Sequence, residues 1–151
     1  MSTRRFALLL GLFFVLAGIA GFLPFLAHPE AGATLADNAI APAHHGAILG
    51  TGDAMLFGLF PVNAAHNVVH LLFGLWGVLA ARSLRGATLY ARSVAVIFFV
   101  LAVAGLLPSV QTGFGLFPLY AKDVWLHGLI ALGGVYFGWT THDGERPDPA
   151  P

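Results

Sequence analysis

Apolar residues form four long stretches, separated by polar or glycine- and proline-rich segments. The stretches cover about residues 6–26, 61–81, 90–107 and 118–140. Each approaches the roughly 20 residues that a helix needs to cross a bilayer. The pattern predicts an all-α integral membrane protein, a bundle of four transmembrane helices. Pro61 and Pro118 are expected at the first helical positions of the second and fourth spans, where the missing N–H would be unpaired anyway.

The segments outside the spans differ in character. The outer loop, about residues 27–57, is rich in Ala, Gly and Pro and is expected to be partly irregular, with Ile48 to Phe60 apolar enough to lie on the membrane surface. Its His44–His45 pair either binds a metal ion or belongs to a solvated turn. Two exposed histidines more often belong to a solvated turn. The polar residues 142–151, which include three prolines, are expected to be a short disordered tail.

The first span has an alternative interpretation as a signal peptide. Arg4 and Arg5 precede the apolar run, and Ala31-Gly32-Ala33 follows it like a cleavage site. The run is longer than the 7–15 residues usual for a signal peptide. The length favours a retained span.

The basic residues indicate how the spans are oriented. In a four-span topology six arginines lie on one side of the membrane, and Lys122 alone lies on the other. Because cytoplasmic loops carry the excess of Lys and Arg, both chain ends are predicted to be cytoplasmic. Aromatic belts at the membrane interfaces are expected at Tyr90 and Trp139 on the inner side and at Tyr120 and Trp125 on the outer side.

Composition narrows the range of functions. The chain is 58% hydrophobic and only 9% charged, whereas soluble domains carry about 25% charged residues. Lipid is therefore the expected surrounding. The formal net charge is zero, without a basic block, which argues against nucleic acid as a partner. The chain has no cysteine, so disulfides and thiol chemistry are excluded. No nucleophile–base pair is visible, which favours a non-enzymatic protein.

A weak internal duplication runs through the chain. Gly58-Leu59-Phe60-Pro61 recurs at 115–118, and in that register His70 aligns with His127 and Gly77 with Gly134. Upstream, the sequence at 21–24 resembles that at 105–108. These matches predict two tandem hairpins related by a pseudo-two-fold axis along the membrane normal, as in parallel repeats. The alternative is chance similarity between apolar sequences.

Four ionisable residues within the predicted spans form the candidate site: His66, His70, Asp123 and His127. Each pair is four residues apart and so shares one helix face. Small residues extend both faces, and they include the Gly-x-x-x-Gly motif of Gly134 and Gly138, which favours close helix packing.

Ionisable groups inside a membrane are expensive, usually face the bundle interior and often mark function. One interpretation is structural: the groups hydrogen-bond to one another and pin the helices of an accessory membrane component. A second is a redox protein in which the four side chains hold a transition metal, or His70 and His127 hold a haem. A third is a small transporter or proton conduit.

The segment from Gly58 to Leu75, with Asn63, His66, Asn67, His70 and Gly74 as its most specific positions, resembles an uncharacterised bacterial membrane family, domain of unknown function 4383. The arginine-led first helix and the histidine of the fourth helix also match. The resemblance implies four spans and a bacterial inner membrane, and it implies no activity.

Overall fold

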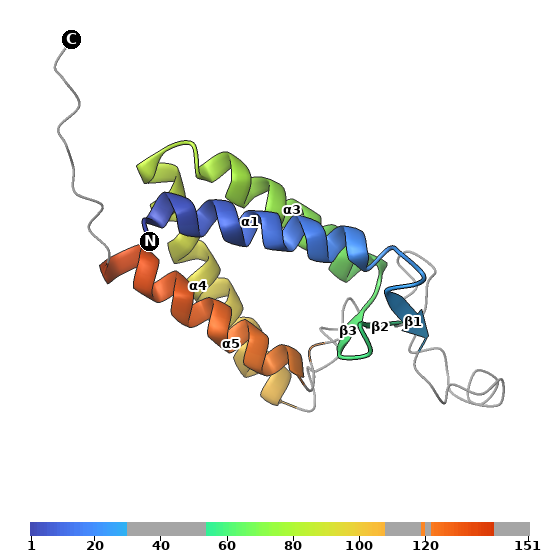
Figure 1. Ribbon diagram of the computed structural model, residues 1–151. Helices are drawn as coiled ribbons and strands as arrows, with labels where there is room; N and C mark the ends of the chain where they lie inside the picture. Colours follow the sequence, from blue (N-terminus) through green and yellow to red (C-terminus); the bar gives the residue numbers. More distant parts are fainter. Residues whose placement is uncertain (30–53, 108–118, 120–121, 141–151) are drawn as a thin grey trace, which may run out of the picture.

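The computed structural model describes residues 1–29, 54–107, 119 and 122–140 (Figure 1). This part of the chain contains four α-helices and three short strands. The helices are α1 (Thr3–Ala20), α3 (Ala64–Ala80), α4 (Leu84–Leu106) and α5 (Lys122–Val135), and α5 continues as the π-helix η2 (Tyr136–Thr140). The strands are β1 (Ala27–Pro29), β2 (Ala54–Leu56) and β3 (Phe60–Val62).

The helices pack as two pairs, α1 with α3 and α4 with α5 (Figure 1). Small residues explain the close approach within the first pair. A Cβ added to Gly11 of α1 would lie 2.9 Å from the carbonyl oxygen of Gly74 on α3, and one added to Gly77 would lie 2.8 Å from the Cα of Gly11. Backbone touches backbone here, so no larger side chain fits without moving the helices apart.

The second pair is equally tight. A Cβ at Gly134 of α5 would lie 2.7 Å from the carbonyl oxygen of Ala91 and from the backbone nitrogen of Ala95, both on α4. One helical turn later, a Cβ at Gly138 would lie 2.9 Å from the Cγ of Arg92. The close packing expected of the Gly-x-x-x-Gly motif is therefore confirmed.

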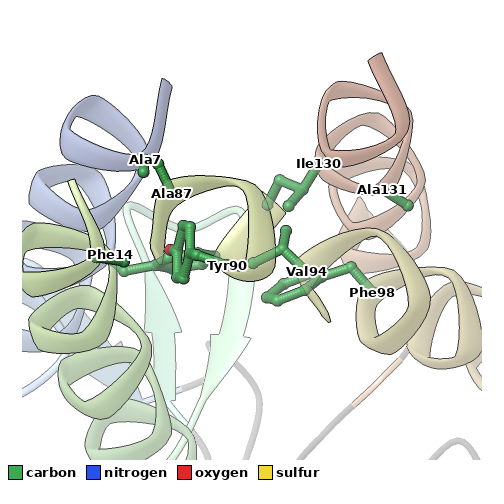
Figure 2. Packing of buried hydrophobic residues seen from close by; sticks show 9 residues of the cluster. Ala7, Phe14, Ala87, Tyr90, Val94, Phe98, Ile130 and Ala131 are labelled. Carbon is green, nitrogen blue, oxygen red and sulfur yellow. The ribbon is translucent and has the colours of Figure 1, made fainter. Parts of the chain in front are cut away.

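The two pairs meet in a hydrophobic core, whose side chains come from all four helices (Figure 2). Tyr90 of α4 lies at its centre, with no exposed surface and its ring 5.2 Å from that of Trp76. An aromatic belt residue would face its membrane interface, whereas the side chain of Tyr90 is buried in this core.

In the part of the chain that the structure describes, two helices are long and apolar enough to cross a membrane, α1 and α4. The helix α3 is a shorter apolar helix of 17 residues. The outer faces carry large exposed apolar side chains, such as Leu16, Leu72, Phe99 and Leu132, each more than 60% exposed. The faces of α3 and α5 that carry the histidines and the small residues were expected to point inward. The buried glycines and the exposed apolar side chains on the opposite faces confirm this prediction.

The predicted helical architecture is confirmed, and a short three-stranded antiparallel sheet in the order β1-β2-β3 is added to the helices. Part of the expected irregular outer loop forms β1 and β2. Residues 54–60, expected on the membrane surface, form β2, a turn and the start of β3. Leu56 and Val62 bury their side chains beside Ala20 and Ala27 in a small apolar cluster, which explains why this segment folds back onto α1.

The helix boundaries also differ from those predicted. Pro61 lies in β3 rather than at a helix start, because Asn63 is the residue that caps α3. The first helix ends at Ala20 rather than Leu26, and the turn begins at Gly21. The predictions for Pro118, Tyr120, the His44–His45 pair and the 142–151 tail fall outside the described residues.

Candidate functional site

A partly open cavity of about 400 Å³ lies between the helix pairs and next to the sheet. Most of its wall is apolar and comes from α1, β2, β3 and α5. Its polar members are the four predicted site residues, His66, His70, Asp123 and His127. Five phenylalanine rings also line it, those of Phe13, Phe14, Phe57, Phe60 and Phe98.

The first histidine pair is positioned by the start of α3. The side chain of Asn63 accepts a hydrogen bond of 2.9 Å from the backbone nitrogen of His66 and so caps the helix. His70 follows one turn later on the same face. The Nε2 atoms of His66 and His70 are 3.0 Å apart, a hydrogen bond in which one ring donates and the other accepts.

The second pair comes from the start of α5. Asp123 and His127 are buried, with 3% and 4% of their surface exposed. The imidazole of His127 packs against Phe98 with ring centroids 5.2 Å apart, and that of His70 packs against Phe14 at 5.4 Å. Because Phe14 and Phe98 are themselves 5.3 Å apart, a continuous row of rings joins α3 to α5 through α1 and α4.

Several buried polar atoms of the cavity have no hydrogen-bond partner among the described residues. They are Oδ2 of Asp123 and the Nδ1 atoms of His70 and His127. Leaving a buried polar group unsatisfied costs about 1–3 kcal/mol. Native structures rarely retain such groups without a partner of some kind, so these atoms point to a bound molecule or ordered water in the cavity.

All four side chains singled out in the sequence thus line one cavity. The described hydrogen bonds join two of them, His66 and His70, and not the histidine–aspartate pair of α5. Within residues 1–29, 54–107, 119 and 122–140, no group of three or more His, Asp or Glu side chains is arranged to hold a metal ion.

Two features of the site were missed in the sequence. Asn63 before an apolar run is a helix-start signal, which could have placed the first turn of α3 at His66. No such signal marks the five phenylalanines of the cavity wall, because the described phenylalanines occur at both buried and exposed positions.

Comparison with known proteins gives a family and nothing more. No curated protein and no solved structure matches the chain. One family model matches residues 4–140, which include all four helices, the sheet and every residue of the cavity. The chain therefore belongs to the family described as Domain of unknown function (DUF4383).

Proposed function

We propose that this protein is an accessory, non-enzymatic membrane protein that binds a small, largely apolar molecule in the cavity beside the His/Asp cluster. The single observation that carries the proposal is the cavity itself. Protein interiors are close-packed, whereas this bundle leaves about 400 Å³ next to buried polar atoms. That volume falls in the range of about 300–1,000 Å³ typical of small-ligand sites, as do apolar walls with a few convergent polar groups.

We further propose four spans, with both termini on the cytoplasmic side of a bacterial inner membrane. The 17 residues of α3 reach the lower limit of about 17–25 for a span, and η2 lengthens α5 at its end. Arginines gather at one end of the bundle. Arg4 donates hydrogen bonds to the carbonyls of Ala81 and Arg82, and Arg92 donates one to that of Gly138. This end also holds the N-terminus (Figure 1), in keeping with the positive-inside rule.

The proposal includes two tandem hairpins related by a pseudo-two-fold axis. Its support is that residues aligned by the repeat make two matching contacts, a glycine against the first helix of its pair and an imidazole against a phenylalanine. The matched contacts are Gly77–Gly11 with Gly134–Ala95, and His70–Phe14 with His127–Phe98. An experimental structure in which these contacts do not superpose would contradict the symmetry.

Ligand retention tests the proposed function. Protein purified in a mild detergent is extracted with organic solvent, and co-purified compounds are quantified by mass spectrometry against the protein concentration. The test variant is Ala17→Phe, which fills the cavity from α1, and the matched control is Val96→Phe, which adds the same ring at a position 58% exposed. We expect one compound class near equimolar amounts in the wild type and in Val96→Phe, and its loss in Ala17→Phe. Equal retention in all three would refute the proposal.

A metal site is the second candidate, favoured by the geometry of His66 and His70. An imidazole nitrogen binds a metal ion at about 2.0–2.1 Å. Two such nitrogens on one ion therefore lie roughly 2.9–3.4 Å apart when the nitrogen–metal–nitrogen angle is about 90–109°. The observed Nε2–Nε2 distance is 3.0 Å. If metal is bound there, elemental analysis should find it in the wild type, and His70→Ala should abolish retention while leaving the metal-free protein nearly as stable. If His70 only pins the helices, the same change should destabilise the protein whether or not metal is present.

A further inference from the structure

We propose that the ligand of this cavity is a lipophilic organic cation, held by the carboxyl group of Asp123 and the surrounding phenylalanine rings. This inference rests on the proposed function and adds the chemical class of the ligand. It starts from Asp123, which lines the cavity at 3% exposure and whose Oδ2 atom has no hydrogen-bond partner among the described residues.

No cationic side chain neutralises this carboxyl group within the described part of the chain. The neighbouring Lys122 is exposed, and Arg4 and Arg92 are engaged with backbone carbonyls at the opposite end of the bundle. A carboxylate in apolar surroundings is costly unless it is paired, and the cost is removed either by a proton or by a cation. A bound organic cation would supply the missing partner.

The remainder of the wall fits the body of such a molecule. Five phenylalanine rings surround the cavity, and the face of an aromatic ring attracts a positive charge within about 6 Å of its centroid. Among the described residues that line the cavity there is no Lys or Arg, and Asp123 is the sole acidic side chain.

Phe57 adds an observation from the sheet. It has a φ of +54°, followed by Gly58 at +67°, in the turn between β2 and β3. A bulky residue in this region is an outlier that costs about 1–3 kcal/mol and persists where the surroundings require it. The Phe57 side chain lines the cavity, and 59% of its surface is exposed. A neutral, oxygen-bearing ligand would satisfy the imidazoles but would leave the carboxylate uncompensated, so the cation is the better match.

Two probes of the same shape and opposite charge test the charge preference. Tetraphenylphosphonium is a cation and tetraphenylborate is an anion, and each carries four phenyl rings on one central atom. Binding of radiolabelled probes to the full chain in dodecyl maltoside is measured by equilibrium dialysis at pH 8, with protein-free micelles as the blank. Each probe is measured in a separate dialysis, because the two ions pair with each other; we expect saturable binding of the phosphonium and no saturable binding of the borate.

Asp123→Asn keeps the size of the side chain and removes its charge. We expect it to lower phosphonium affinity by roughly 30-fold or more, which corresponds to about 2 kcal/mol at 1.4 kcal/mol per tenfold. Should Asp123→Asn fail to fold, Ala17→Phe with its control Val96→Phe takes its place. Loss of phosphonium binding in Ala17→Phe alone, together with exclusion of the borate, then supports the inference.

The outcomes separate the two proposals. If uncharged triphenylmethanol binds saturably, is excluded by Ala17→Phe and binds as well as the phosphonium, then the cavity is a ligand site and the cation inference is wrong. Unchanged phosphonium affinity in a folded Asp123→Asn variant overturns the inference in the same way. If none of the three probes distinguishes the wild type from Ala17→Phe, the proposed function itself fails.

Discussion

Replacing Gly134 by alanine should push α5 away from α4 and weaken the bundle. The new Cβ would lie 2.7 Å from the carbonyl oxygen of Ala91 and from the backbone nitrogen of Ala95. Both contacts are with helix backbone, so no side chain can rotate away, and overpacking of this kind costs about 1–3 kcal/mol. Alanine also gains up to about 1 kcal/mol of helix propensity over glycine, which partly offsets the clash.

A second glycine of the same helix isolates the clash. A Cβ at Gly128 would meet no described atom within 4 Å. Gly128→Ala should therefore gain helix propensity without a steric clash. The difference in the free energy of unfolding between the two variants should therefore be about 1–3 kcal/mol, at least a fivefold change in the equilibrium constant. Reversible unfolding in mixtures of dodecyl maltoside and SDS, followed by circular dichroism, measures it. Equal stability of the two variants would refute the close approach of α4 and α5.

The remaining predictions concern the cap, the topology and the strained turn. Asn63→Ala should lower the free energy of unfolding by about 1 kcal/mol, because the hydrogen bond to the start of α3 is lost, while Asn63→Ser should retain most of it; equal losses in both variants would contradict the capping role. Reporter fusions after Arg85 and at the C-terminus should be cytoplasmic and fusions near Asp37 and Gly113 external, and an external C-terminus would reject four spans. Phe57→Asn should raise thermal stability slightly, since asparagine tolerates a positive φ, yet weaken ligand binding; unchanged binding would remove Phe57 from the cavity wall.

The buried and exposed faces of α3 and α5 could be predicted well from the sequence, because small and polar residues recur on one face of each helix and large apolar residues on the other. The buried stripe of α5, from Asp123 to Gly138, follows directly from a spacing of three and four residues. The position of each helix along the chain was less predictable. Pro61 is compatible both with a helix start and with an edge strand. The strand is formed because the neighbouring Val62 packs into the apolar cluster with Ala20 and Leu56.

The sheet itself could not be predicted from local patterns. Each strand has three residues, too few for an alternation of apolar and polar positions to stand out. The pairing of Ala27 with Leu56 joins segments far apart in the sequence. Tyr90 is a similar case: an aromatic residue near a span end fits a membrane interface, and it is the absence of a side chain at Gly77 on the neighbouring helix that makes room for its ring.

The cavity follows from a contrast between contacts within and between the helix pairs. Within a pair, glycine and alanine bring the backbones together, at Gly11 with Gly77 and at Gly134 with Ala95. Between the pairs, the described contacts near the N-terminus include the stacked rings of Phe6 and Phe137, and farther along the pairs meet through aromatic rings. Because aromatic rings are larger than glycines, the two helix pairs lie farther apart than the two helices within each pair. The distance between the pairs increases further toward the sheet (Figure 1). The polar ends of α3 and α5 therefore face a space that their own helices cannot fill. A small-residue motif in the sequence predicts which helices pair, whereas the spacing between pairs depends on side chains from four helices at once.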